Sequence, residues 1–185
     1  MAEYIKEIKG SPPPDRLLVG LETECIEVRS GELKVALLQL CIGPCCLIYQ
    51  VLHAGYKLPD VLSKFLSEEG HIFVGAHISI DVERLEQDCG ITISNWRDLQ
   101  PIVSEVDDKY NNLYQNGYRS SLEKIGNVVL DLPLFKNRRV NHRLWGSRCL
   151  EDWQVQYATK DAFLSFEIPN QLEIKHGYRF VPDDI

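Results

Sequence analysis

The chain has 185 residues, of which 44% are hydrophobic and 25% charged, and its formal net charge is −7. This size and balance predict one domain with a sizeable core, and the negative charge excludes a protein that coats nucleic acid through its overall field. No apolar run reaches the roughly 18 residues of a membrane span, and the start of the chain lacks the apolar stretch of a signal peptide. We therefore predict an intracellular protein, nuclear or cytoplasmic, with no membrane partner.

The first part of the chain predicts an arm followed by strands. Residues 1–16 are expected to form an N-terminal arm, because three consecutive prolines in it cannot continue a helix. Residues 17–180 are expected to form a single domain. Apolar runs bounded by turn residues predict its first three strands, at residues 17–21, 34–42 and 46–51. Short turns between consecutive strands predict an antiparallel meander.

Later segments alternate strands with helices. Helices are predicted from Pro59 to about Ser67, over 80–89, from Ser120 or Ser121 to Val129, and over 151–171 with Pro169 distorting or ending the last one. Buried and edge strands are predicted at 71–76 and near 98–99. Strands first and interleaved helices later predict an α/β layer fold.

Four acidic residues and one tyrosine are spaced to converge. Glu22 and Glu24 stand two apart at the end of the first strand, which places both side chains on one face. Asp81 follows a second buried strand, and Tyr157 and Asp161 are four apart on the last helix, where such residues are neighbours. Carboxylates gathered this closely repel one another unless a cation lies between them, and oxygen ligands suit Mg²⁺ or Mn²⁺.

Each of these residues also has a structural explanation. Glu22 and Glu24 could be solvated acids at a strand end, and Asp81 could simply cap a helix. Tyr157 could be an aromatic residue of the core. The order and spacing of the set favour a site for divalent metal ions and phosphate chemistry.

That order resembles the tyrosine-containing (DEDDy) branch of the 3′→5′ exonuclease superfamily, and within it the plant proteins related to the Werner-syndrome exonuclease domain. The resemblance extends from about residue 17 to residue 172. It rests on the acidic motifs and on segments 35–41, 46–50, 73–75 and 150–158. It implies an RNase H-like mixed sheet, with three antiparallel strands first and flanking helices, and a nucleic acid partner with a free 3′ end, DNA or RNA.

The resemblance also implies a two-metal mechanism with Mg²⁺ or Mn²⁺. Glu22 would bridge both ions, Glu24 and Asp161 would complete one metal site, and Asp81 would hold the second ion. Tyr157 would orient the attacking water through its hydroxyl group.

The chain departs from the family pattern at two positions. The family has Asp where this chain has Glu22, and the extra methylene displaces the carboxylate by about the length of a C–C bond; a misplacement of about 1 Å can lower a rate about a hundredfold. The alternative is therefore a catalytically deficient pseudo-exonuclease that binds nucleic acid or a protein partner, and Glu22→Asp is expected to raise activity. His77 stands where relatives commonly have a small or apolar residue. Its side chain could reach the metals, or it could lie in the core or at the rim of the site.

A basic segment predicts contacts to nucleic acid. The expected contact residues, which share positive charge or an aromatic ring, are Lys136, Arg138, Arg139, Arg143 and Trp145. A solvated basic loop is the alternative. Tyrosines at 110, 114 and 118 have helical spacing and could stack on bases or pack on the sheet.

Six cysteines predict reduced, mostly structural thiols. Adjacent Cys45 and Cys46 cannot both face the core of one strand, so one of them is expected to be exposed and oxidisable. No interface pattern stands out in the sequence, which is compatible with either a monomer or an oligomer.

Overall fold

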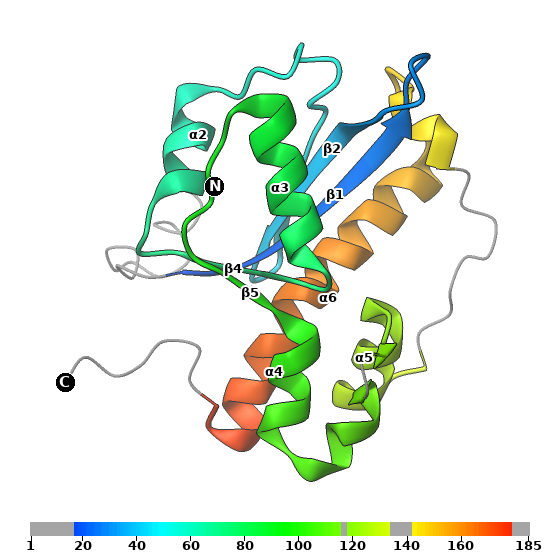
Figure 1. Ribbon diagram of the computed structural model, residues 1–185. Coiled ribbons are helices and arrows are strands. Elements are labelled where there is room, and N and C mark those ends of the chain that lie inside the picture. The colour runs from blue at the N-terminus through cyan, green and yellow to red at the C-terminus, as the bar shows by residue number, and fades with distance from the viewer. Residues whose placement is uncertain (1–16, 116–117, 134–141, 179–185) are drawn as a thin grey trace.

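A mixed sheet of five strands organises the molecule (Figure 1). The computed structural model describes residues 17–115, 118–133 and 142–178. Strands β1 (Leu18–Glu27), β2 (Leu33–Ile42) and β3 (Cys45–Tyr49) form an antiparallel meander, as predicted. Strands β4 (Ile72–Gly75) and β5 (Trp96–Asp98) continue the sheet on the other side of β1 and run parallel to it. The α/β fold with three antiparallel strands first is confirmed, and the predicted arm at residues 1–16 lies outside the described residues.

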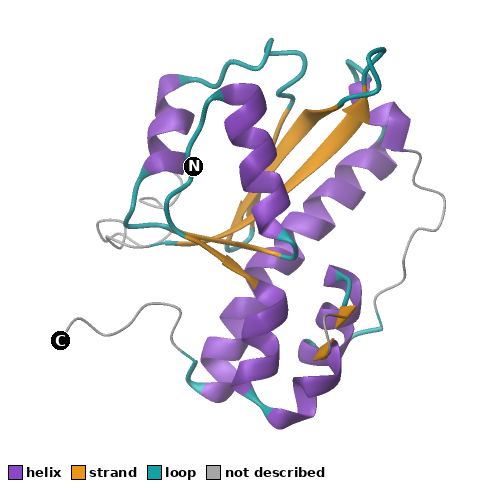
Figure 2. Cartoon of the chain, in the orientation of Figure 1, coloured by secondary structure: helices purple, strands orange, loops and turns teal. Residues whose placement is uncertain are grey.

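Helices cover both faces of this sheet (Figure 2). Helices α2 (Asp60–Ser67) and α3 (Ile78–Cys89) pack on one face. The long helix α6 (Asp152–His176) packs on the other, with α4 (Leu99–Val106) and α5 (Leu122–Val129) against its second half. None of the helices in the described ranges is long and apolar enough to cross a membrane.

Local signals placed several helix ends correctly. Helix α2 begins directly after Pro59, as expected of a residue that needs no N–H partner there. The Ser121 hydroxyl accepts a hydrogen bond from the Lys124 amide, and α5 begins at the next residue. Gly90 ends α3 with φ +67°, a left-handed conformation that glycine adopts without strain.

Three expectations about element boundaries were wrong. Strand β1 continues to Glu27, so Glu22 and Glu24 lie within it. Helix α4 was missed: Asp98 ends β5 and its carboxylate accepts from the Gln100 amide, which caps a new helix. Helix α6 continues past Pro169 to His176 and is capped by Gly177, because Pro169 is buried and its packing outweighs the lost hydrogen bond.

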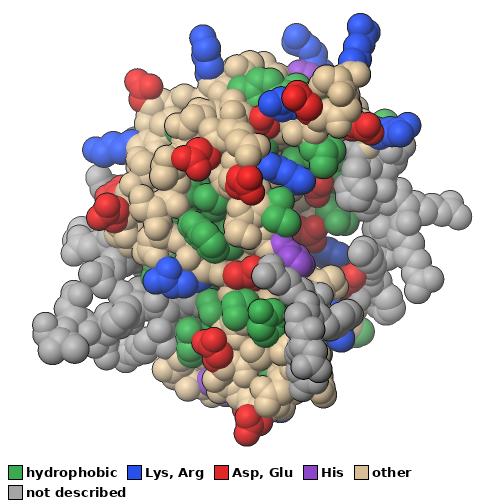
Figure 3. Space-filling model, in the orientation of Figure 1, with side chains coloured by type: hydrophobic (Ala, Val, Ile, Leu, Met, Phe, Trp, Pro, Cys, Tyr) green, Lys and Arg blue, Asp and Glu red, His purple; other side chains and the backbone are tan. Residues whose placement is uncertain are grey.

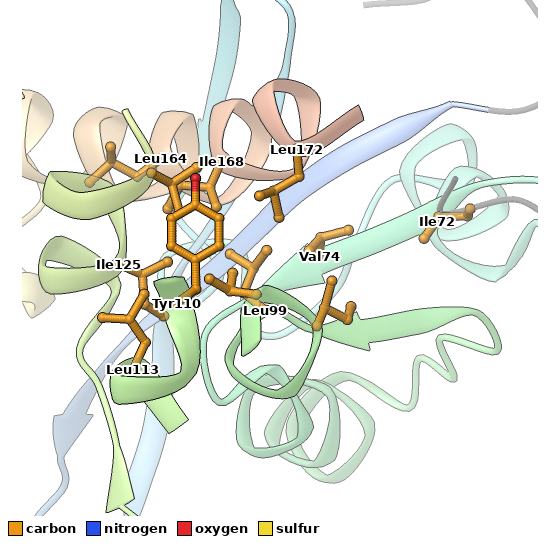
Figure 4. Packing of buried hydrophobic residues seen from close by; sticks show 12 residues of the cluster. Ile72, Val74, Leu99, Tyr110, Leu113, Ile125, Leu164, Ile168 and Leu172 are labelled. Carbon is orange, nitrogen blue, oxygen red and sulfur yellow. The ribbon is translucent and has the colours of Figure 1, made fainter. Parts of the chain in front are cut away.

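The tyrosine-rich segment does not form the expected helix. A 3₁₀ helix, η1 (Asp108–Leu113), is followed by a small hairpin of β6 (Tyr114–Gln115) and β7 (Tyr118–Arg119). Tyr110 is 2% exposed and its ring lies among Ile125, Leu164 and Ile168 (Figure 4). Packing, and not base stacking, is therefore the role of Tyr110.

Candidate active site

Helix α6 lies directly against the backbone of β1. A Cβ atom at Gly20 would stand 2.3 Å from the Ala162 carbonyl oxygen and 2.6 Å from the Phe166 amide nitrogen, so only glycine permits this approach. Because side chains two apart on a strand share a face, Gly20, Glu22 and Glu24 all face α6. The close approach brings the two glutamates to the helix that carries Tyr157 and Asp161.

Glu22 is held by donors from two other elements. Its carboxylate accepts a hydrogen bond from the buried Ser165 hydroxyl at 2.5 Å, and another from the Ala76 backbone amide. Gly75 lies beneath it: a Cβ there would stand 3.3 Å from Glu22 Oε1. The longer side chain of Glu22 therefore has a set of partners that reaches from the end of β4 to the middle of α6.

A second polar side chain lies beside Glu22, on the neighbouring strand β2. Gln39 of β2 pairs with Glu22 in register and is 1% exposed. Its Nε2 atom has no hydrogen-bond partner within the described residues. A buried amide without a partner is energetically costly. Because cross-strand neighbours lie within side-chain reach of each other, the Gln39 amide can donate a hydrogen bond to the Glu22 carboxylate or to a ligand bound there.

Helix α6 presents three polar residues on one stripe. Tyr157, Asp161 and Ser165 follow one another at intervals of four and therefore share a face. A capping box fixes the start of the helix, with the Gln154 side chain accepting from the Glu151 amide at 2.9 Å. The close contact of α6 with Gly20 fixes where these three side chains lie along β1.

Asp81 reaches the site from the end of β4. The chain leaves β4 at Gly75, turns at His77 and enters α3 at Ile78, which places Asp81 in the first helical turn. Asp81 is 8% exposed, and its carboxylate accepts a hydrogen bond from the Thr23 hydroxyl of β1. This contact ties α3 to β1 one residue from each of the two glutamates.

The carboxylates influence one another's charge strongly. Burial, together with Asp81 and Asp161, raises the pKa of Glu22 well above its usual value. Burial and the same two aspartates raise the pKa of Glu24 to about 8, and burial raises that of Asp81 to about 6. Burial and Asp161 also raise the pKa of Tyr157. The five predicted residues therefore form one electrostatically coupled group, in which Asp81 is buried and the other four are half-buried.

The oxygen ligands of this group fit a hard divalent cation, but the acidic side chains do not converge on one metal position. All four acids offer oxygen atoms, the ligands that Mg²⁺ and Mn²⁺ prefer. As placed in the described part of the chain, however, no three or more His, Cys, Asp and Glu side chains are arranged to hold a metal ion. The partners of Glu22 and Asp81 explain this, because both carboxylates are turned toward hydroxyl groups of the protein.

His77 lies at the rim of the site and not among the carboxylates. Its backbone is left-handed, with φ +61°, a conformation that favours glycine. Its ring Nε2 lies 2.8 Å from the Gln100 side-chain nitrogen, and that nitrogen donates to the Ser120 carbonyl oxygen at 2.7 Å. The positive φ explains why a small residue suits this position, and the ring connects α3 to α4.

The predicted nucleic-acid contacts have three different outcomes. Lys136, Arg138 and Arg139 lie outside the described residues, and Arg143 is exposed. The prediction for Trp145 was wrong: its side chain is fully buried and cannot stack on a base. It packs instead against Tyr157, with ring centroids 5.8 Å apart, because the 3₁₀ helix η2 (His142–Gly146) folds back onto the sheet.

Sequence reasoning missed Ser165, Gln39 and Thr23. The spacing of four that links Tyr157 to Asp161 continues to Ser165, so that residue had a signal in the sequence. Gln39 and Thr23 had none, because their roles depend on which strand and helix lie opposite them.

Charges of both signs are interspersed on the surface. On the face of the molecule shown in Figure 3, Lys and Arg side chains stand mainly around the edge, among Asp and Glu side chains. This distribution agrees with the net charge of −7. The described residues on this face do not form a broad positive surface.

A family model described as 3'-5' exonuclease matches residues 1–175. Human exonuclease 3'-5' domain-containing protein 2 is 28% identical over 167 residues, which cover 88% of this chain and 26% of the relative. The chain thus spans about a quarter of that protein's length.

Solved structures share the fold at lower identity. Brucella melitensis NrnC bound to pGG has a TM-score of 0.67 and 19% identity, covering 85% of this chain and 72% of its own. The same protein is also known with bound Mg²⁺. Escherichia coli RNase D has a TM-score of 0.66 and 18% identity, covering 95% of this chain and 42% of its own.

Proposed function

The chain belongs to the 3'-5' exonuclease family, and on that premise we propose that it hydrolyses nucleic acid from the 3′ end at the site formed by β1, α3 and α6. The observation that carries the proposal is the single electrostatically coupled group of Glu22, Glu24, Asp81, Tyr157 and Asp161. The family's acidic motifs occur in order along the chain, and three different elements bring them together.

Glu22, Glu24, Asp81 and Asp161 would hold Mg²⁺ or Mn²⁺, and the raised pKa values of the first three support this assignment. Acids buried beside one another favour protonation unless a cation compensates their charge. When bound, two such ions lower the pKa of the attacking water and stabilise the leaving 3′ oxygen. Ser165 and Thr23 would position Glu22 and Asp81 for the ions, through the hydrogen bond that each hydroxyl donates to one oxygen of its carboxylate.

Tyr157 orients water in this proposal and does not act as a base. Burial and the neighbouring Asp161 raise its pKa, so the phenol stays protonated at neutral pH. A protonated phenol both donates and accepts hydrogen bonds, which suits it to fix a water molecule. Trp145 packs behind the ring and restricts its orientation.

The substrate class is nucleic acid with a free 3′ end, DNA or RNA. The complex of NrnC with pGG supports a nucleic acid substrate by its shared fold. We assign phosphate contacts to Arg143, which is exposed, and to the sequence-predicted basic residues 136, 138 and 139. The same proposal includes an intracellular location and a closer kinship with the Werner-type branch, and it is compatible with either a monomer or an oligomer.

A pseudo-exonuclease is the second candidate, and one observation favours it. The Glu22 carboxylate is engaged by Ser165 and Ala76, and the described carboxylates do not converge on a metal position. If the carboxylates keep this unconverged arrangement with metal present, the domain would bind nucleic acid or a protein partner without turnover.

Degradation of 5′-labelled oligonucleotides tests the two candidates directly. Single-stranded DNA, recessed duplex and RNA are each incubated with Mg²⁺ or Mn²⁺ and the wild type, Asp161→Asn or Asp152→Asn. Asp152 is an exposed acid on the same helix and provides the matched control. We expect a 3′→5′ ladder from the wild type and Asp152→Asn, and at least about a hundredfold slower degradation by Asp161→Asn. Tight binding without any ladder would establish the pseudo-exonuclease.

A further inference from the structure

The hairpin of β2 and β3 places two cysteines directly opposite each other. Cys41 pairs with Cys46, and Ile42 pairs with Cys45 beside a two-residue turn that begins at Gly43, with φ +56°. The turn's own hydrogen bond joins Ile42 to Cys45. The next pair, Cys41 and Cys46, is then the non-hydrogen-bonded kind, with Cα atoms about 4.5 Å apart. Disulfides span about 4.4–6.8 Å between Cα atoms, so the backbone permits a bond here.

The side chains of this pair already meet. The Cys41 and Cys46 sulfur atoms lie 2.7 Å apart, and both cysteines are free thiols. A disulfide bond measures about 2.05 Å, so bond formation requires only a small further approach. No displacement of the strands is needed, because residues facing each other in a ladder share one face of the sheet.

The two thiols differ in access. Cys41 is fully buried, while Cys46 is half-buried and can be reached by a small oxidant. The hydrogen bond between them lowers the pKa of Cys46, against the opposing effect of burial, and raises that of Cys41. This difference assigns the first reaction to Cys46 and the second to Cys41.

We propose that Cys41 and Cys46 are a reversible modification site at which a peroxide closes an intramolecular cross-strand disulfide. The Cys46 sulfur attacks one peroxide oxygen, so that an S–O bond forms, the O–O bond breaks and water leaves. The Cys41 sulfur then attacks the Cys46 sulfenic sulfur; the S–S bond forms, the S–O bond breaks and a second water carries away the thiol proton. The two thiols are oxidised by two electrons in total, and one hydrogen peroxide is reduced to two waters.

The position of the pair gives this reaction a protective effect. The Cys46 sulfur lies 3.8 Å from the carbonyl oxygen of Thr159, between Tyr157 and Asp161 on α6. A sulfinic acid at Cys46 would add oxygen atoms and charge under that helix and is not reversed by thiols. Rapid attack by Cys41 intercepts the sulfenic acid before this step, and the disulfide leaves α6 in place.

Peptide mapping of the full chain after hydrogen peroxide treatment tests the proposal without reference to nuclease activity. We expect a non-reduced digest to link the peptides of Cys41 and Cys46, with loss of two hydrogens, and dithiothreitol to restore both thiols. Exposed Cys149 provides the internal control for unassisted oxidation. If Cys149 is oxidised while no Cys41–Cys46 link forms, the proposal is overturned.

Single cysteine variants test whether Cys41 protects Cys46 from further oxidation. In Cys41→Ala the resolving thiol is absent, and we expect Cys46 to accumulate sulfinic and sulfonic acid that dithiothreitol does not remove. In Cys45→Ala the disulfide should form as in the wild type, because Cys45 pairs with Ile42. Equal and fully reversible oxidation of Cys46 in wild type and Cys41→Ala overturns the protective role. The wild-type map reports the bond even if a variant folds poorly.

Discussion

The two faces of the sheet are built on different principles. The face under α2 and α3 is packed mainly with apolar residues, such as Leu21, Leu66 and Leu85, and α3 contributes one buried acid, Asp81. The face under α6 has apolar clusters too, but at its centre the half-buried Glu22 is hydrogen-bonded to the buried Ser165. An apolar face tolerates approximate packing, whereas buried polar groups require specific partners. Glu22, Glu24 and Asp161 therefore lie where α6 packs closely against β1, and Asp81 joins them from α3.

Gly20→Ala is expected to have the largest effect on turnover, because it forces α6 away from β1. The new Cβ would meet backbone atoms of Ala162 and Phe166, which cannot rotate aside. We expect a loss of about 1–3 kcal/mol or more in the free energy of unfolding, and at least about a hundredfold lower turnover. Urea unfolding and the oligonucleotide assay measure the two effects.

Two controls make this comparison specific. Gly146→Ala introduces a Cβ whose nearest neighbour is the end of the Ile26 side chain at 3.4 Å, and it should change little. Leu66→Ala on the opposite face should lower the free energy of unfolding by about 2–5 kcal/mol while folded protein keeps its turnover. If Leu66→Ala and Gly20→Ala reduce turnover equally, the two faces do not differ as described.

Glu22→Asp tests whether the hydrogen-bond partners of this carboxylate fix its position on the α6 face. The sequence alone favours a gain in activity, whereas the contacts of Glu22 lead us to expect a loss. The shorter side chain leaves the Ser165 hydroxyl and the Ala76 amide without their acceptor. We expect turnover to fall roughly tenfold to a hundredfold, measured with the same labelled oligonucleotide.

Ser165→Ala supplies the second arm of this test. It should lower turnover in the wild type and have a much smaller effect in Glu22→Asp, because the partner of Ser165 is already lost. Ser165→Thr keeps the hydroxyl and should restore part of the activity. Higher turnover in Glu22→Asp would instead identify Glu22 as a defect of the site.

His77→Val tests the turn that delivers Asp81 to the site. A β-branched residue is poorly tolerated at φ +61°, so we expect a loss of about 1–3 kcal/mol in the free energy of unfolding. His77→Asn provides the control, because Asn adopts this conformation readily. Equal stability of the two variants in thermal unfolding would show that backbone strain at this turn is unimportant.

The pH dependence of stability should show the smallest effect. Burial raises the pKa of Glu24 from 4.5 to about 8, so the folded protein binds a proton that the unfolded chain has released in this range. The stability contributed by protonated Glu24 is complete below pH 4.5 and is lost as the pH rises toward 8. We therefore expect the Tm of the metal-free protein to be higher at pH 6 than at pH 8.

Magnesium and Glu24→Gln check the origin of this effect. Mg²⁺ should raise the Tm more at pH 8 than at pH 6, because it binds the ionised carboxylates. Glu24→Gln should reduce the dependence of Tm on pH, since a neutral amide does not titrate. An unchanged slope in this variant would mean that Glu24 is not responsible.

Most of the elements, and the acidic character of the site, could be predicted from local patterns of residues, although α4 and the hairpin of β6 and β7 could not. Local rules of capping and periodicity placed the ends at Pro59, Gly90 and Ser121, and the spacing of acids on single elements predicted which side chains share a face. These signals act over a few residues and can therefore be read along the chain.

The contacts between these elements depend on the three-dimensional fold. Trp145 lies in a basic segment, yet it is buried against Tyr157, and Cys41 and Cys46 face each other beneath α6. The partners of Glu22 come from β4 and α6, far away in sequence. Such contacts depend on the register of strands and on the approach of a helix to a glycine, and no local pattern of residues specifies them.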